Sequence, residues 1–240
     1  MNNQDQRDSI NATVGPGHWL LAIDTSSEQL GIAMTDGVDI TELSLPGGRQ
    51  QTTSLLPLID FLGARAGLHQ SDFGAVAVAT GPGSFTGLRV GLSLAKGMAL
   101  AQQSAVIGIP TLDVVARPYR STRQAVVATL PAGRSRIVWC RVSDAGVLGP
   151  AVNCGLDEFL DEIGCLPDQL IVGELSAAAE ALLLERGVRV ETRLLGGRRA
   201  AALAELGFER WQLGQISDAE SLEPIYLHGK QTSLPPRSQR

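Results

Sequence analysis

Two short segments of this chain contain the residue types that bind phosphate or a metal ion. The first, Asp24-Thr25-Ser26-Ser27, follows the apolar run Leu20–Ile23. The second is the glycine-rich stretch ATGPGSFTGLRV, residues 79–90, which follows the apolar run GAVAV. A carboxylate suits a metal, and a glycine-rich turn before a helix offers free N–H groups to phosphate. Either segment is therefore a candidate catalytic site.

The glycine-rich stretch departs from the known phosphate-binding patterns. No Lys-Ser or Lys-Thr follows a glycine at the Walker spacing, and Thr86 stands where a dinucleotide-binding loop needs glycine. Ser84 lacks the flanking glycines of a nucleophile elbow. The stretch instead predicts a sharp turn and a helix N-cap, with an anion site as the alternative. The turn and cap residues are Gly81, Pro82, Gly83, Ser84 and Thr86.

The Asp24–Ser27 segment lies at the end of a predicted strand, in a hairpin. In kinases of the actin and sugar-kinase type such a hairpin meets ATP phosphates and a metal, and a second acidic hairpin completes the site. The corresponding stretch here, ATLPAGRSRIVWC, has no Asp or Glu and offers Pro131, Arg134 and Arg136. The segment is therefore interpreted as a vestigial phosphate-type hairpin made of Asp24, Thr25, Ser26 and Ser27. We predict no catalytic residue, no metal ligand and no cofactor.

The predicted helix from about Gly87 to Gln102 is apolar over most of its surface. Arg89, Ser93 and Lys96 form one narrow polar stripe, and almost every other position is apolar or small. A helix that packs only on its own core usually shows one apolar stripe and a broad polar face. Two explanations remain open: complete burial inside one core, or a second face that binds a partner protein.

The elements that position these segments predict an α/β protein of two similar halves. Three strands precede a helix at about Thr53–Ala66, and strands and helices alternate from there to about residue 117. A basic, proline-containing stretch follows, and the same order begins again. We expect a flexible extension over residues 1–17, a first subdomain over 18–117, a second over 118–228 and a disordered tail over 229–240.

Composition narrows the classes of function. The formal net charge of −5 argues against independent nucleic-acid binding. Cys140, Cys154 and Cys165 predict free thiols in a reducing cytoplasm, and no apolar run is long enough to cross a bilayer. The chain is therefore expected to be cytoplasmic. Three arginines form a modest basic patch that could touch RNA as a minor contributor: Arg117, Arg120 and Arg123.

Four segments together resemble the bacterial TsaB family, also called YeaZ. They are LAIDTSSEQLGIAM, TTSLLPLIDFL, ATGPGSFTGLRVGLSLAKGMAL and EPIYL, and the resemblance is strongest over about residues 19–117. It implies the ASKHA fold (actin-like ATPase, ribonuclease-H-like), with two α/β subdomains that each contain a mixed sheet. Departures from the family pattern include Gln51, where a histidine is common, and His228 after Tyr226-Leu227.

The resemblance also implies a function and partners. Such proteins are non-catalytic subunits that dimerise with TsaD, a catalytic paralogue, and support threonylcarbamoyl transfer to the adenosine beside the anticodon of tRNA. TsaE joins through the TsaB–TsaD complex, and tRNA is met only within that complex. The resemblance places the partner surface on the two helices of the first subdomain. The candidate residues are Leu55, Leu56, Ile59, Leu62, Leu88, Arg89, Val90, Leu92, Ser93 and Lys96.

Two alternative functions remain open, and the chain alone is expected to self-associate. An ASKHA-type small-molecule kinase would need two acidic hairpins, and only one is seen. A protease acting on TsaD would need a nucleophile with a base, and no such sequence pattern emerges. Without its partner, the chain is expected to form a homodimer through the same apolar helices.

Overall fold

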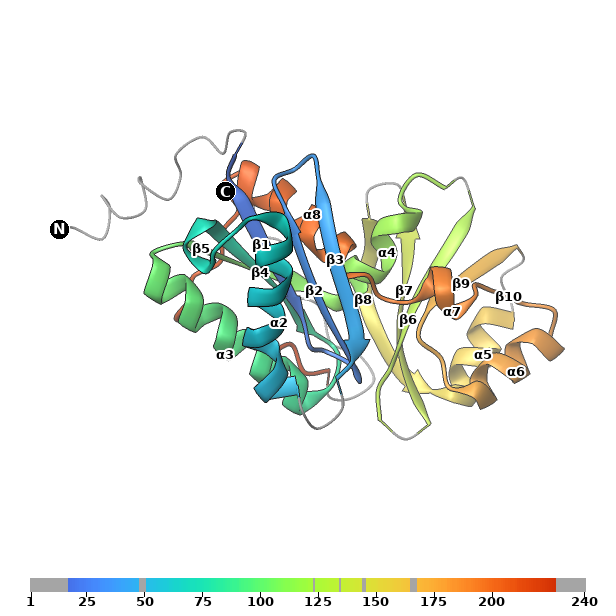
Figure 1. The fold of residues 1–240 in the computed structure, drawn as a ribbon. Coiled ribbons are helices and arrows are strands. Elements are labelled where there is room, and N and C mark those ends of the chain that lie inside the picture. Colours follow the sequence, from blue (N-terminus) through green and yellow to red (C-terminus); the bar gives the residue numbers. More distant parts are fainter. Residues whose placement is uncertain are drawn as a thin grey trace. The chain divides into compact units, whose positions relative to one another are not determined.

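The computed structural model describes residues 17–47, 51–122, 124–133, 135–143, 146–164 and 168–227. The chain forms two compact units (Figure 1): residues 1–109 with 199–224, and residues 110–198 with 225–240. Of the predicted termini, residues 1–16 and the whole tail 229–240 lie outside the described residues. None of the described helices is both long enough and apolar enough to cross a lipid bilayer.

The first unit contains a five-stranded mixed sheet. The three strands predicted before the first helix are β1 (Trp19–Asp24), β2 (Gln29–Thr35) and β3 (Ile40–Pro46), and they form an antiparallel meander. Strand β4 (Phe73–Gly81) pairs with β1 in parallel, and β5 (Ala105–Pro110) completes the order β3-β2-β1-β4-β5. A short 3₁₀ turn, η2 (Gln70–Asp72), leads into β4.

Alternation along β1 and β4 determines which helices cover each face of this sheet. Leu21, Ile23 and Val78 point toward α2 (Gln51–Ala66) and α3 (Phe85–Gln102), with which they form one buried cluster. Successive strand residues point to opposite faces. Leu20 and Ala77 therefore meet α8 (Ala200–Gln212) on the other face, where a Cβ on Gly207 would lie 2.5 Å from the Ala77 Cβ.

A segment after α8 closes the β5 edge of the sheet. The Ser217 N–H donates to the Val106 carbonyl at 2.8 Å, and the Gly108 N–H donates to Ser217 Oγ at 2.9 Å. Arg210 Nη1 donates to the Gly108 carbonyl at 2.9 Å. These bonds satisfy backbone groups that an uncovered edge strand would leave open to another chain.

The second unit repeats the topology of the first. Strands β6 (Ala125–Pro131), β7 (Arg136–Ser143) and β8 (Gly146–Gly155) form an antiparallel meander, and β9 (Gln169–Gly173) pairs with β6 in parallel. With β10 (Arg189–Val190) the order is β10-β9-β6-β7-β8. The predicted duplicated α/β architecture is therefore confirmed.

Helices cover both faces of the second sheet. Helix α4 (Thr111–Ala116), which continues into the 3₁₀ turn η3 (Arg117–Tyr119), packs on one face. Helices α5 (Leu156–Gly164) and α6 (Ala177–Glu185) pack on the other. Strand β10 is short because the chain turns soon after it into α7 (Arg193–Gly196), where the Gly196 N–H donates to the Thr192 carbonyl at 2.7 Å.

The division into units differs from the predicted boundaries at residues 117 and 228. Helix α4 follows the strands of the first half in sequence but belongs to the second unit. Helix α8 follows the second half but packs on β1, β2 and β4 of the first unit. Chain order cannot show which sheet an amphipathic helix covers, so the sequence placed both helices in the wrong subdomain.

Two helical glycines test this packing as a matched pair. Gly207→Ala should lower the free energy of unfolding by about 1–3 kcal/mol, because its Cβ would overlap the Ala77 side chain. Gly97→Ala should raise it by about 0.5–1 kcal/mol, because a Cβ there meets nothing within 4 Å and alanine favours the helix. Urea unfolding of both variants measures the difference. Equal effects would show that α8 does not pack closely on the first sheet.

Candidate functional site

The glycine-rich loop ends β4 and begins α3 with a side-chain cap. Ser84 is the N-cap residue of α3, and its Oγ accepts from the Gly87 N–H at 3.2 Å. Of the two predicted cap residues, Ser84 is confirmed, while Thr86 lies within the first turn of the helix. The Ser84 N–H donates to the Ser26 carbonyl at 2.7 Å, which joins the loop to the Asp24–Ser27 hairpin.

The polar groups of the hairpin are used within the protein. Asp24, Thr25 and Ser26 are all at least 95% buried. Asp24 Oδ1 accepts from the backbone N–H of Ser26 at 2.8 Å and from its hydroxyl. Thr25 Oγ1 donates to the Gly87 carbonyl at 2.6 Å. Ser27, at the edge of the turn, accepts from the Gln29 N–H at 3.0 Å.

Glycines bring α3 directly onto this hairpin. A Cβ on Gly83 would overlap the Ser26 carbonyl oxygen, and one on Gly91 would overlap Thr25 Oγ1. At Gly87 the added carbon would overlap the Thr25 carbonyl oxygen. The two segments that the sequence offered as separate phosphate sites are thus the two sides of one packed joint. Its groups serve structure, in agreement with the turn-and-cap interpretation.

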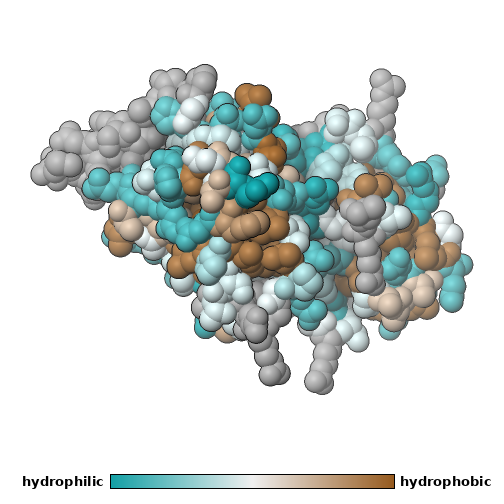
Figure 2. Space-filling view, in the orientation of Figure 1, coloured by the Kyte–Doolittle hydropathy of each residue, from teal (hydrophilic) through white to brown (hydrophobic). Residues whose placement is uncertain are grey.

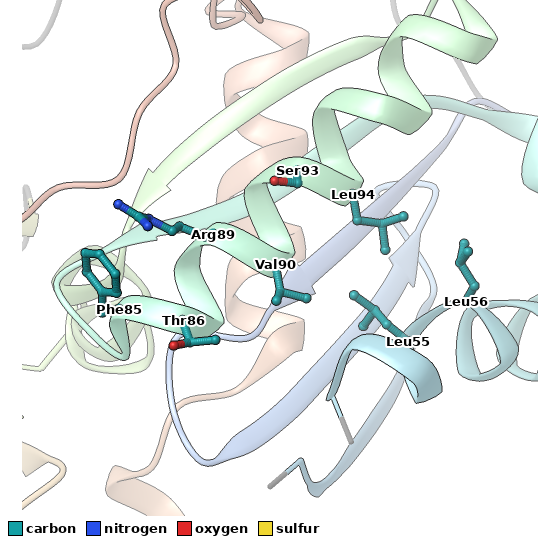
Figure 3. A pocket seen from close by; sticks show the side chains of 8 residues that line it. All are labelled: Leu55, Leu56, Phe85, Thr86, Arg89, Val90, Ser93 and Leu94. Carbon is teal, nitrogen blue, oxygen red and sulfur yellow. The ribbon is translucent and has the colours of Figure 1, made fainter. Parts of the chain in front are cut away.

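An apolar groove lies between α2 and α3 on the outer side of these helices (Figure 3). Its volume is about 570 Å³, and Arg89 is the single charged residue among those that line it. Leu56 is 43% exposed and Phe85 is 54% exposed. Figure 2 shows hydrophobic residues gathered on the face where Figure 1 places α2. The lining residues are Leu55, Leu56, Phe85, Thr86, Arg89, Val90, Ser93 and Leu94.

One end of the groove has a defined polar feature. The Arg89 guanidinium carbon lies 3.9 Å from the centroid of the Phe85 ring, on the next turn of α3. This geometry is a cation–π contact, which restrains a long and otherwise mobile side chain. The groove therefore combines exposed apolar surface with a positioned cation.

The structure corrects the predicted partner surface. Five of the ten candidates are at least 96% buried in the core of the first unit: Leu55, Ile59, Leu62, Leu88 and Leu92. The remaining candidates are partly or fully exposed: Leu56, Arg89, Val90, Ser93 and Lys96. In α2, Leu55, Ile59 and Leu62 recur at helical spacing and form the stripe that faces the sheet. Leu56 lies off that stripe and reaches solvent.

Three groove residues were absent from the predicted partner surface: Phe85, Leu94 and Thr86, of which Thr86 was predicted as a cap residue. Phe85 was a detectable signal, because it follows the cap residue directly in a chain with only five phenylalanines. An exposed aromatic side chain at a helix start contributes little to the core of its own unit. Leu94 is half-buried and carried no separate signal.

The second unit uses its corresponding hairpin for structure. Arg136 Nε donates to Asn153 Oδ1 at 3.0 Å, and Arg136 Nη2 donates to the Asn153 carbonyl at 2.8 Å. Asn153 Nδ2 in turn donates to the Leu227 carbonyl at 2.9 Å. Pro131 ends β6, and Arg134 lies outside the described residues.

The predicted arginine patch and possible metal-binding side chains are the remaining candidate groups. Of the predicted basic patch, Arg117 and Arg120 are half-buried around η3, and Arg123 lies outside the described residues. A Cβ on Gly146 would lie 3.1 Å from Arg120 Nη2, so this guanidinium packs against the β8 backbone. Among the described residues, no group of three His, Cys, Asp or Glu side chains could hold a metal ion.

Comparisons with known proteins match a TsaD family model and relatives that carry the TsaB name. A family model described as "TsaD: tRNA N6-adenosine threonylcarbamoyltransferase" matches residues 45–195. A Haemophilus influenzae protein named "tRNA threonylcarbamoyladenosine biosynthesis protein TsaB" is 33% identical over 89% of this chain and 94% of its own length. An Escherichia coli protein of the same name is 34% identical over 50% of this chain and 53% of its own length.

A solved structure agrees with the fold. A Pseudomonas aeruginosa protein, described as uncharacterized with similarity to the peptidase YEAZ, matches 88% of this chain and all of its own with a TM-score of 0.73. The identity between the two is 25%. This match and the two mixed sheets confirm the predicted actin-like, ribonuclease-H-like fold class.

The joint predicts a difference between two threonines. Thr25→Val should lower the free energy of unfolding by about 1–3 kcal/mol, because the buried Gly87 carbonyl loses its donor. Thr86→Val, at an exposed position on the same helix, should change it by less than about 0.5 kcal/mol. Urea unfolding measures both values. Equal effects of the two substitutions would contradict the packed contact between the Asp24–Ser27 hairpin and α3.

The cysteines give a second test, of chemical reactivity. Burial is the main cause that raises the pKa of Cys140 to about 12, and burial also raises the pKa of Cys154. Both thiols are therefore protonated at neutral pH. In a Cys165→Ser variant, an aromatic disulfide reagent at about pH 8 should react slowly until denaturant is added. Rapid release of one thiol equivalent per folded chain would overturn this expectation.

Proposed function

The chain belongs to the TsaB (YeaZ) family, and we propose that it acts as the non-catalytic subunit that dimerises with TsaD. In this role it supports threonylcarbamoyl transfer to the adenosine beside the anticodon of tRNA. The observation that carries the proposal is the apolar groove between α2 and α3, with Leu56 and Phe85 exposed on its walls. The chain contributes an interface, and its partner contributes the reacting groups.

The groove has the composition of a protein-binding surface. Its walls are leucine, valine and phenylalanine side chains, and one arginine lies at the end of α3 where Phe85 begins the helix. Aromatic residues and arginine are enriched at the centres of protein interfaces, where they carry much of the binding energy. Exposed apolar side chains from two neighbouring helices would be covered by helices of the partner.

The packed joint supports the non-catalytic role. In the kinase alternative, the Asp24–Ser27 hairpin would have to bind phosphates and a metal. Here Thr25 bonds to the Gly87 carbonyl, and α3 rests on the hairpin through Gly83, Gly87 and Gly91. Opening this hairpin to a nucleotide would require α3 to move away from it.

The match to the TsaD family model raises a second candidate, in which this chain is itself the transferase. A paralogue of TsaD would also produce such a match, and the relatives that extend over most of the chain carry the TsaB name. The joint favours the non-catalytic role. Transfer by this chain without TsaD, in a mixture that contains tRNA and the activated threonylcarbamoyl donor, would favour the second candidate.

The proposal includes further associations. TsaE would join through the TsaB–TsaD complex, and tRNA would be met only within it. Without TsaD, the same exposed residues would pair two copies of this chain in a homodimer, because the apolar groove would otherwise remain in water.

Substitutions on the groove wall test the proposed interface. Leu56→Glu and Val90→Glu should each weaken association with TsaD by at least about tenfold, because a carboxylate would be buried without a partner. Both positions reach solvent in the free chain, so folding should be retained. Leu92→Glu is unsuitable, because Leu92 is 97% buried in the first unit. Calorimetry with purified TsaD measures the affinity, and circular dichroism checks the fold.

Leu184→Glu is the matched control. Leu184 is 55% exposed on α6 of the second unit, and its substitution should leave TsaD binding unchanged. Transferase activity of TsaD with and without this chain completes the test. If TsaD binds the groove variants as tightly as the wild type, the proposed surface is wrong. If TsaD neither binds this chain nor gains activity from it, the proposed function is wrong.

A further inference from the structure

We propose that Arg89 selects the occupant of the α2–α3 groove: a partner helix that presents a carboxylate, in preference to a second copy of this chain. This inference rests on the proposed function and specifies the chemistry of the partner. It concerns the choice between two occupants of the same apolar groove, which apolar contacts alone would not distinguish.

The position of Arg89 suits the recognition of a carboxylate. It is the single charged residue among the eight that line the groove, and its guanidinium lies over the Phe85 ring at 3.9 Å. A guanidinium offers several donors in a fixed plane and pairs with a carboxylate through two parallel hydrogen bonds. The stacking on Phe85 holds that plane at the groove, so less rotamer freedom is lost when a partner binds.

The charges of the two helices favour an acidic partner. Helices α2 and α3 together contain three cations and one carboxylate, whereas the whole chain has a net charge of −5. The carboxylate, Asp60, accepts from Gln70 Nε2 at 2.6 Å. Lys96 Nζ lies 3.5 Å from the Glu220 carbonyl and adds to the positive side of α3. The two helices that form the groove therefore carry a net positive charge on a protein that is acidic as a whole.

A second copy of this chain would complement that surface poorly. A two-fold dimer brings the same surface patch of both subunits together, so a cationic patch meets a cationic patch. A partner helix with a carboxylate opposite Arg89 would instead gain a charge-assisted pair at the edge of an apolar contact. The groove supplies affinity for either occupant, and the arginine supplies the preference between them.

Salt should affect the two associations in opposite directions. Dissolved ions screen attraction and repulsion between exposed charges alike. Raising the salt concentration should weaken binding of the acidic partner and strengthen self-association. If the groove bound both occupants through apolar contacts alone, a rise in salt concentration would change both affinities in the same direction.

The experiment measures TsaD binding and self-association of the full chain at about 50 mM and about 500 mM NaCl. For the wild type, TsaD affinity should fall several-fold with salt, and the homodimer should become tighter. Arg89→Gln should weaken TsaD binding several-fold at low salt, reduce its salt-induced fall and tighten the homodimer, because both copies lose the same positive charge. Arg186→Gln, at an exposed position that caps α6 in the second unit, is the control for total charge and should behave as the wild type.

The outcomes separate this inference from the proposed function. If Arg89→Gln binds TsaD with wild-type affinity and salt dependence while Leu56→Glu does not bind, the selection by Arg89 is wrong and the groove remains the interface. If Arg89→Gln weakens the homodimer and TsaD binding equally, Arg89 provides affinity without selection and the inference is also wrong. If wild-type TsaD binding is absent, both proposals are wrong.

Discussion

The contact between the Asp24–Ser27 hairpin and the start of α3 determines the arrangement of the first unit. Thr25 Oγ1 donates to the Gly87 carbonyl at 2.6 Å, and glycines at 83, 87 and 91 allow the helix to approach the hairpin without side chains between them. With this face of α3 fixed inward, Val90, Ser93 and Leu94 turn outward and form the groove with α2. A larger residue at Gly87 would overlap the Thr25 backbone and displace the surface on which the proposed function depends.

Much of the fold could be predicted from local patterns, and less of the site. Ser84 as the cap, the two strand meanders and the helix boundaries follow from residue types and periodicity, because these features depend on near neighbours. The direction of each α3 side chain could not be predicted in this way, because α3 is apolar nearly all round. Only its packing shows that Leu88 and Leu92 face inward. In α2, the apolar stripe of Leu55, Ile59 and Leu62 identifies the buried side of the helix. The exposure of Leu56 follows from its place outside that stripe.

The two units share a topology but differ in what they leave exposed. In the second unit, Arg136 is bound to Asn153, which also holds the Leu227 carbonyl, so the hairpin cation stabilises the chain itself. In the first unit, the cation near the groove stacks on an exposed aromatic ring at the surface. One duplicated architecture thus places one arginine in an internal role and another at a surface suited to recognition, and this difference is consistent with a protein that functions by binding.

The position of α8 in the sequence has a consequence during synthesis on the ribosome. Leu20 and Ala77 lie on strands made early, yet the helix that covers them spans Ala200–Gln212. The apolar face of the first sheet therefore stays uncovered until almost the whole chain has been translated. The second unit, most of which lies between residues 110 and 198, can close before then. Domains usually fold from the N-terminus during synthesis, whereas here the N-terminal unit needs a helix made near the end of the chain, so one apolar face of its sheet stays exposed through most of synthesis.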